Sequence, residues 1–329
     1  MLKSLQKAFK VKEVRDRLLY TFMMLVVIRI GCCLPIPGVD PSYLHDFFSN
    51  LQNSGMGFFN AITGGSFSSM SIFALSITPY ITSSIIMQLL TIAIPKLEEM
   101  QKDGEDGRKK IAEYTRYLTV GLALFESCAM AVGLGGKGLL LEDHRNIWGY
   151  LTVVAAMTAG SALLMWIGER ITDNGVGNGI SIVLLINIVS GTPQDMMTLY
   201  ERFMAGRSVA VATVSGIIVL AIIVAIVVFV LVLNDAERRI PVQYSKKMQG
   251  RRMIGGQSTY IPLKVNTANV IPVIFASSIM SMPVMIAQFF HVDYSTIGGK
   301  ILLALSSSNW FKPEAPAYSI GMLVYIVLV

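Results

Sequence analysis

The chain has 329 residues, of which 53% are hydrophobic and only 15% are charged, and its net charge is +6. The mean hydropathy is +0.59. A soluble protein of this length would have too few polar residues to cover its surface, so the composition excludes a soluble globular domain and indicates an integral membrane protein.

The chain opens on a basic, fairly polar segment, residues 1–17, which has no short apolar core ending in a small-residue cleavage site. We therefore expect no removable signal peptide. A membrane-spanning helix needs about 20 mostly apolar residues. The clear candidates for such helices are residues 18–34, 71–95, 117–134, 147–168, 209–233 and 270–290.

A last apolar run begins near Ala317 and stops at Val329 after thirteen residues. This run is too short to cross a bilayer. We therefore expect the chain to end inside a helix, as a fragment would.

Residues 55–70, GMGFFNAITGGSFSSM, are too short and too polar to form a span. Phe58, Phe59 and Ile62 give an amphipathic pattern that is followed by Gly64 and Gly65. The pattern predicts a short re-entrant helix with a glycine hinge that leads into the second span. An interfacial external loop is the alternative.

The stretch GVGNGISIVLLINIVSGTP, residues 175–193, has an apolar core of only ten residues. Cytoplasmic loops carry an excess of Lys and Arg. Counting this stretch as a span places twenty Lys and Arg residues inside and six outside, whereas leaving it out would place the seven of residues 234–266 outside. We therefore predict a fifth span from Ile180 to about Tyr200. Its middle would be broken at residues 190–193 and would line a cavity or be buried in protein.

The sequence offers little chemistry for an enzyme. The three histidines are expected in external loops, and among the predicted spans only the fifth carries an Asp, Asp195, so neither a Ser/His dyad nor an aspartyl pair is predicted. No strand precedes GVGNG, so a dinucleotide-binding loop is not expected there. Its glycines predict a tight turn into the fifth helix. Cys32, Cys33 and Cys128 lie in apolar runs without metal-ligand spacing and are expected to pack in the core.

Two ionisable residues, Arg29 and Glu126, fall within the predicted spans other than the fifth. Such residues are functional candidates by default. Their estimated depths in the membrane are similar, so we expect a structural ion pair between them. A proton relay is the alternative.

Residues 237–266 alternate apolar and polar side chains on both sides of MQG, which predicts a β-ribbon with basic residues near its tip. Arg251 and Arg252 at the turn would suit docking of an acidic partner, either RNA phosphates or a protein. The alternative is that these are ordinary positive charges of a cytoplasmic loop.

Five segments, in order along the chain, carry a resemblance to a known family: IRIGCCLPIPGVD, SIFALSITPYITSSIIMQLL, DGRKKIAEYTRYLT, GERITDNGVGNGISI and QSTYIPLKVNTANVIPVIFASS. They closely resemble the bacterial SecY protein-translocation channels. The resemblance implies an all-α polytopic membrane protein, a ten-helix clamshell of two inverted halves, truncated here within the eighth helix. Residues 18–200 would form the N-terminal half and residues 209–329 part of the C-terminal half.

The resemblance implies a passive conduit for unfolded secretory proteins, with an hourglass pore and lateral release of apolar segments into lipid. The implied pore ring is Ile77, Ile81, Ile180, Leu184 and Ile274. The implied plug half-helix covers about residues 58–69 and includes Phe58, Phe59, Asn60, Ile62, Gly64 and Gly65. The lateral gate between helices two and seven would include Gln88, Asn266, Ser277 and Ser278. The docking residues would be Arg238, Arg239, Lys246, Lys247, Arg251 and Arg252.

The spacing of the ring residues is compatible with this role. Ile77 and Ile81 are four residues apart on one helical face, as are Ile180 and Leu184. Branched aliphatic side chains exclude hydrated ions by dewetting and can part around an extended peptide. Packing against lipid or another helix is the alternative.

The implied partners are the ATPase SecA or a ribosome contacting the loops through its RNA, SecE, SecG, signal peptides, nascent chains and membrane lipid. No cofactor, metal or catalytic activity is expected, and the energy would come from a partner. The expected location is the bacterial plasma membrane, with the N-terminus in the cytoplasm. The last cytoplasmic loop, helices nine and ten and a sixth ring residue would be missing. The alternative is an ion-coupled secondary transporter with a broken-helix site, which Glu126 favours and the basic ribbon disfavours.

Overall fold

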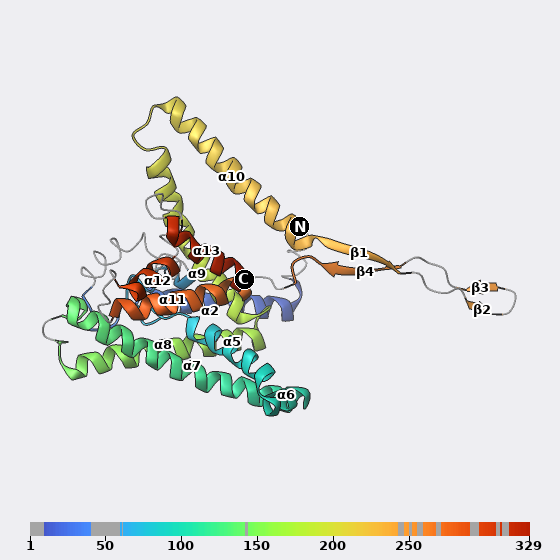
Figure 1. Cartoon of the computed structure of the whole chain (residues 1–329), viewed down its shortest axis with the longest axis horizontal. Helices are drawn as coiled ribbons and strands as arrows, with labels where there is room; N and C mark the ends of the chain where they lie inside the picture. Colours follow the sequence, from blue (N-terminus) through green and yellow to red (C-terminus); the bar gives the residue numbers. More distant parts are fainter. Residues whose placement is uncertain are drawn as a thin grey trace. The chain divides into compact units, whose positions relative to one another are not determined.

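The computed structural model describes residues 10–40, 60, 62–141, 144–242, 247–249, 252–254, 259–267, 271–289, 296–306, 310 and 316–329. The structure is mostly helical, as predicted (Figure 1). Its longer helices are α2 (Lys12–Cys33), α5 (Thr78–Ala93), α7 (Glu105–Leu134), α8 (Ile147–Asn174), α9 (Gly179–Phe203), α10 (Val209–Asp235) and α11 (Ile271–Phe289). The shorter ones are α6 (Pro95–Lys102), α12 (Ile297–Leu305) and α13 (Ile320–Leu328).

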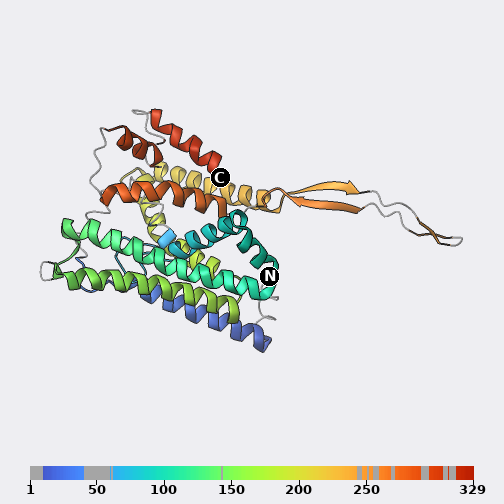
Figure 2. The ribbon, with the colours of Figure 1, turned by 60° about the horizontal axis from the view of Figure 1, so that its bottom comes forward.

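The chain divides into two compact units, which are described separately. The first comprises Met1–Thr192 and Ile274–Val329, and the second comprises Pro193–Val273. In the first unit, α7 packs along α8 and α5, and α2 packs along α8. Figure 2 shows α2, α8 and α7 side by side.

The core of the first unit depends on close approach between backbones. Met130 of α7 and Met157 of α8 are buried in one apolar cluster with Phe67, which precedes α5. A Cβ added at Gly160 of α8 would lie 2.0 Å from the carbonyl oxygen of Ile72, so only glycine fits there. Small residues at such contacts let helices in a membrane pack closely.

The second predicted span, residues 71–95, is helical only from Thr78. Residues 72–77 form turns, and Ser76 has a positive φ of 52° that interrupts a helix in L-residues. Pro79 then occupies the first turn of α5, a position that suits proline. The expected helix was therefore too long at its N-terminal end. At its other end, α5 meets α6 at a bend of 102°.

The predicted break in the fifth span is wrong. Helix α9 runs without interruption from Gly179 to Phe203 and contains Pro193. Proline removes one backbone N–H, which costs the helix the bond to the carbonyl of Val189 but does not have to end it. The residue types at positions 190–193 thus predict a helix break, although the helix continues through them.

In the second unit, α10 buries none of its residues although it is apolar throughout, as expected for a helix that faces lipid. By length and composition, three helices of the described chain can cross a membrane by themselves, namely α8, α9 and α10. The bent pair of α5 and α6 is a fourth candidate. The other predicted spans are represented by helices α2, α7 and α11.

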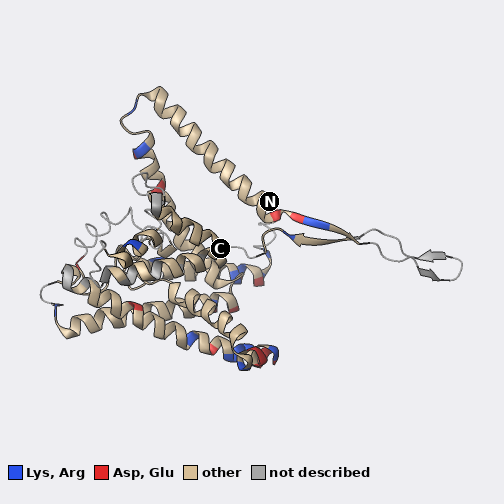
Figure 3. Ribbon diagram, viewed as in Figure 1, with Lys and Arg blue, Asp and Glu red and all other residues tan. Residues whose placement is uncertain are grey.

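The predicted β-ribbon is confirmed. Strands β1 (Glu237–Val242) and β4 (Thr259–Lys264) pair antiparallel, and farther along β2 (Lys247–Gln249) pairs with β3 (Arg252–Ile254). Figure 3 shows charged residues on β1 and around α6, whereas α10 carries almost none along its length.

Candidate functional site

Four of the five predicted ring residues lie in one apolar cluster. Ile77 is fully buried at the start of α5, and Ile81 follows one turn later, partly buried against the same cluster. Ile180 and Leu184, one turn apart on α9, are also partly buried against it. We call these four residues the aliphatic collar. Ile274 lies in α11, and its side chain is outside the described part of the chain.

The collar rests on the backbone of α8 at Gly168. A Cβ added there would lie 3.3 Å from Ile180 and 3.7 Å from Ile77, so the two parts of the collar approach the same point. A Cβ at Gly179 would lie 1.9 Å from the carbonyl oxygen of Gly168. Helices α8 and α9 therefore meet with no room for a side chain at Gly179.

The glycine-rich segment before α9 forms the predicted tight turn. Gly177 has a φ of +72°, a conformation that favours glycine. The side-chain oxygen of Asn178 accepts hydrogen bonds from the N–H of Ile180 at 3.0 Å and from the next residue, which caps the helix. The hydroxyl of Thr21 in α2 accepts the N–H of Val176 at 3.2 Å. The turn thus fixes the point at which the collar residues of α9 begin.

A buried hydrogen-bonded network lies beside the collar, and the sequence reasoning missed it. The amide of Asn187 donates to the hydroxyl of Ser76 at 2.9 Å, and Ser161 of α8 donates to the Ser76 carbonyl at 3.3 Å. Arg29 of α2 donates to the Ser190 hydroxyl at 2.9 Å, which donates to the Asn187 carbonyl at 2.7 Å. We call these five residues the polar cluster. Asn187 within the apolar run of α9 was the signal that could have indicated it.

The expected ion pair between Arg29 and Glu126 is wrong. Arg29 is bonded to Ser190, and one carboxylate oxygen of Glu126 is buried without a hydrogen-bond partner among the described residues. The reason is geometric: Arg29 of α2 is directed to α9, whereas α7, which carries Glu126, packs on α8 and α5. Similar depth in a membrane does not place two residues on facing helix surfaces.

The predicted plug segment is only partly described, because Phe58 and Phe59 lie outside the described residues. Its helical part ends at Thr63, earlier than the expected residue 69. Gly64 and Gly65 have φ angles of +65° and +82°, which end the helix and confirm the predicted glycine bend. The N–H of Gly65 bonds to the carbonyl of Asn60 at 3.1 Å, which closes the last turn.

The glycine bend lies against the polar cluster. A Cβ added at Gly64 would lie 2.7 Å from the carbonyl oxygen of Asn187 and 2.8 Å from the hydroxyl oxygen of Ser190. The segment predicted as a plug therefore touches α9 one to two turns beyond Leu184. This contact links the bend to the helix that carries half of the collar.

The predicted gate residues are found on separate elements. Gln88 is exposed on α5, Ser277 is partly buried on α11, and Asn266 follows β4 in the second unit. The side chain of Ser278 is outside the described part of the chain. Their role as a lateral gate stays a prediction.

The predicted docking residues that the structure describes lie on the strands of the β-ribbon. Arg238 and Arg239 are exposed on β1, and the guanidinium of Arg239 lies 4.7 Å from the ring centre of Tyr260 on β4. Lys247 lies on β2 and Arg252 on β3, whereas Lys246 and Arg251 lie outside the described residues. Binding at these residues stays a prediction.

A family model described as SecY matches residues 71–329. The protein translocase subunit SecY of Streptomyces scabiei is 46% identical to the chain, over all of this chain and 75% of that protein. The corresponding subunit of Halalkalibacterium halodurans is 40% identical, over all of this chain and 74% of that protein.

Two solved structures share the fold. One, described as the structure of a protein conducting channel, has a TM-score of 0.59 and 20% identity, and the match covers 95% of this chain and 70% of that one. The other is Sec61 in the canine ribosome-channel complex from the endoplasmic reticulum, with a TM-score of 0.54 and 20% identity over 95% of this chain and 69% of that one. At this level of identity the likeness concerns the fold alone.

Proposed function

The chain belongs to the SecY family, and from this premise we propose how its collar, its glycine bend and its ribbon serve a protein-conducting channel. It is the channel subunit of a protein translocase, a membrane protein with several apolar helices that spans about three quarters of its relatives' length. Unfolded preproteins cross the membrane through it, and apolar segments leave sideways into lipid.

The observation that carries the proposal is the convergence of Ile77, Ile81, Ile180 and Leu184 on one apolar cluster. These side chains come from two helices and offer no polar group to water. A narrow aliphatic constriction resists wetting, so it excludes hydrated ions while an extended peptide can push the side chains apart. We assign the resting seal of the channel to this collar, together with Ile274.

The glycine bend supplies the second barrier. The close approach of Gly64 to Asn187 and Ser190 holds the plug segment against α9 in the resting channel. The polar cluster bonds α9 to α2 and to the turn before α5, and Ser161 of α8 bonds to the same turn. When a translocating chain displaces the plug segment, the contact between Gly64 and α9 would break, whereas the hydrogen bonds of the polar cluster would remain.

The partners are proposed from the basic ribbon and from the family. The exposed arginines of β1 and the basic outer ribbon suit an acidic surface on SecA or the RNA of a ribosome. SecE and SecG would complete the channel, and the bound ATPase or ribosome would supply energy, because we assign the chain no catalytic role. The location would be the bacterial plasma membrane with the N-terminus inside.

The alternative of an ion-coupled secondary transporter is not supported. The family is that of a protein translocase, and α9 continues where a transporter site would need a broken helix.

The proposal is tested by crosslinking in a version extended to the relatives' full length. A preprotein carrying one cysteine is stalled in the channel, and Leu184→Cys is expected to form a disulfide with it. Leu185→Cys is the matched control, because its side chain is 60% exposed and is rotated by about 100° around the same helix. Equal crosslinking at the two positions would refute the collar as the path of the peptide.

The ribbon gives a separate prediction. Changing Arg251 and Arg252 to Glu should weaken binding of SecA or the ribosome by roughly tenfold to a hundredfold, because each exposed ion pair contributes up to about 1 kcal/mol and reversal adds repulsion. Titration of the partner onto vesicles containing the channel measures this change. Arg202→Glu with Arg207→Glu, expected on the opposite side of the membrane, serves as the control. Unchanged affinity at physiological salt would contradict the docking role.

A further inference from the structure

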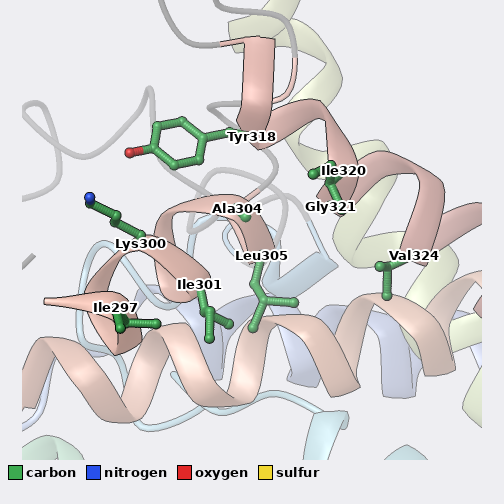
Figure 4. A pocket seen from close by; sticks show the side chains of 9 residues that line it. All are labelled: Ile297, Lys300, Ile301, Ala304, Leu305, Tyr318, Ile320, Gly321 and Val324. Atoms are coloured by element: carbon green, nitrogen blue, oxygen red, sulfur yellow. The ribbon is translucent and has the colours of Figure 1, made fainter.

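A pocket between α12 and α13 has no part in the channel function proposed above. Its volume is about 600 Å³, within the range of small-molecule sites. The apolar part of its lining includes Ile301 and Leu305 from α12 and Ile320 and Val324 from α13 (Figure 4). Ile301 and Ile320 are more than half exposed, so the groove offers a substantial apolar surface to whatever surrounds it.

The pocket also has a polar end. Lys300 and Tyr318 belong to its lining, and Figure 4 shows the amine and the hydroxyl directed to the same side, away from Leu305 and Val324. No ion pair among the described residues includes Lys300. The groove therefore presents a cation and a hydroxyl donor at one end and an aliphatic lining at the other.

The helix that forms the groove belongs at the membrane interface. Nine residues of α12 extend roughly 13 Å, less than half of the bilayer core. Trp310 lies next to the groove, because its indole N–H donates to the Ala304 carbonyl at 2.8 Å and its ring is 5.4 Å from that of Tyr325. Aromatic residues with polar tips gather at the level of lipid headgroups.

We propose that this groove binds one anionic phospholipid. Its phosphate lies between Lys300 and the Tyr318 hydroxyl, and an acyl chain follows Ile301, Leu305 and Val324. Charge complementarity selects an anionic over a zwitterionic headgroup. Burial of the acyl chain supplies affinity that a free phosphate ion would lack. On the orientation proposed above, the lipid belongs to the outer leaflet.

The test uses a version of family length in lipid nanodiscs, in which every tryptophan except Trp310, including Trp148 and Trp166, is replaced with Phe so that Trp310 alone fluoresces. Phosphatidylglycerol with brominated acyl chains should quench Trp310 with an apparent affinity roughly fivefold above that of brominated phosphatidylcholine, the value expected for one basic residue near an anionic lipid. Lys300→Gln should remove this preference. Ile301→Phe, which fills the groove, should reduce quenching by both lipids.

Arg207→Gln removes one positive charge from a segment expected on the same side of the membrane and should leave the preference intact. Equal quenching by the two lipids, or equal effects of Lys300→Gln and Arg207→Gln, would overturn the proposal. Absence of quenching by either lipid would show that another part of the protein fills the groove. If inorganic phosphate abolishes the preference for the anionic lipid and chloride of equal ionic strength does not, the ligand of the groove is a simple anion and not a lipid.

Discussion

Replacing Ile81 and Leu184 of the collar with serine should raise the resting ion conductance of a family-length channel. Each change removes an apolar side chain whose burial is favourable by about 2 kcal/mol, so a lower wetting barrier implies roughly a tenfold rise or more. Single-channel recording in planar bilayers, with SecE present and no preprotein, measures this leak. Deleting residues 58–69 as well should raise the current further, because the plug barrier is then absent.

The controls are serine substitutions on the exposed faces of the same two helices. Ile92→Ser and Leu185→Ser change side chains that are 81% and 60% exposed, and they remove the same kind of apolar group. They should leave the resting current near that of the unmodified channel. A collar variant that leaks no more than these controls would show that the constriction lies elsewhere, even in a working translocation channel.

Substitution of Gly179 should strongly lower the stability of the folded protein. The Cβ of Gly179→Ala would lie 1.9 Å from the carbonyl oxygen of Gly168, and backbone of a packed helix cannot move aside as a flexible side chain can. Overpacking at such a contact costs about 3 kcal/mol or more. We expect a sharp fall in folded protein, measured as the monodisperse fraction and its thermal midpoint in detergent.

Gly121→Ala in α7 is the matched control, because its added Cβ meets no atom within 4 Å. Alanine favours a helix over glycine by up to about 1 kcal/mol, so this variant should be as stable as the unmodified protein or more so. If both alanine variants behave alike, the contact between α8 and α9 is looser than the structure shows.

Local signals in the sequence predicted the local features correctly. Alternation on both sides of MQG indicated the ribbon, and the glycines of GVGNG indicated the turn, because strand period and positive φ depend on neighbouring residues alone. The segment SGTP, residues 190–193, was misleading for the same reason. Proline signals a break locally, but whether a helix continues depends on what surrounds it.

Features that depend on contacts between two distant segments were harder to predict from the sequence. The pairing of Arg29 with Ser190 and of Asn187 with Ser76 depends on which helix faces which, and apolar periodicity does not give that information. The collar illustrates the difference. Spacing placed Ile77 with Ile81 and Ile180 with Leu184, but only the family resemblance placed the two pairs together.

The ribbon has a thermodynamic consequence. An isolated pair of strands is only marginally stable in water, and Ile261 and Leu263 of β4 remain about half exposed. Much of the conformational entropy of this segment is therefore still to be lost when a partner binds. The proposed docking would then resemble coupled folding, with a favourable enthalpy opposed by ordering and with slowed hydrogen exchange at the amides of β1 and β4. Affinity at the ribbon could accordingly be tuned by changing the stiffness of the two strands without altering any residue that touches the partner.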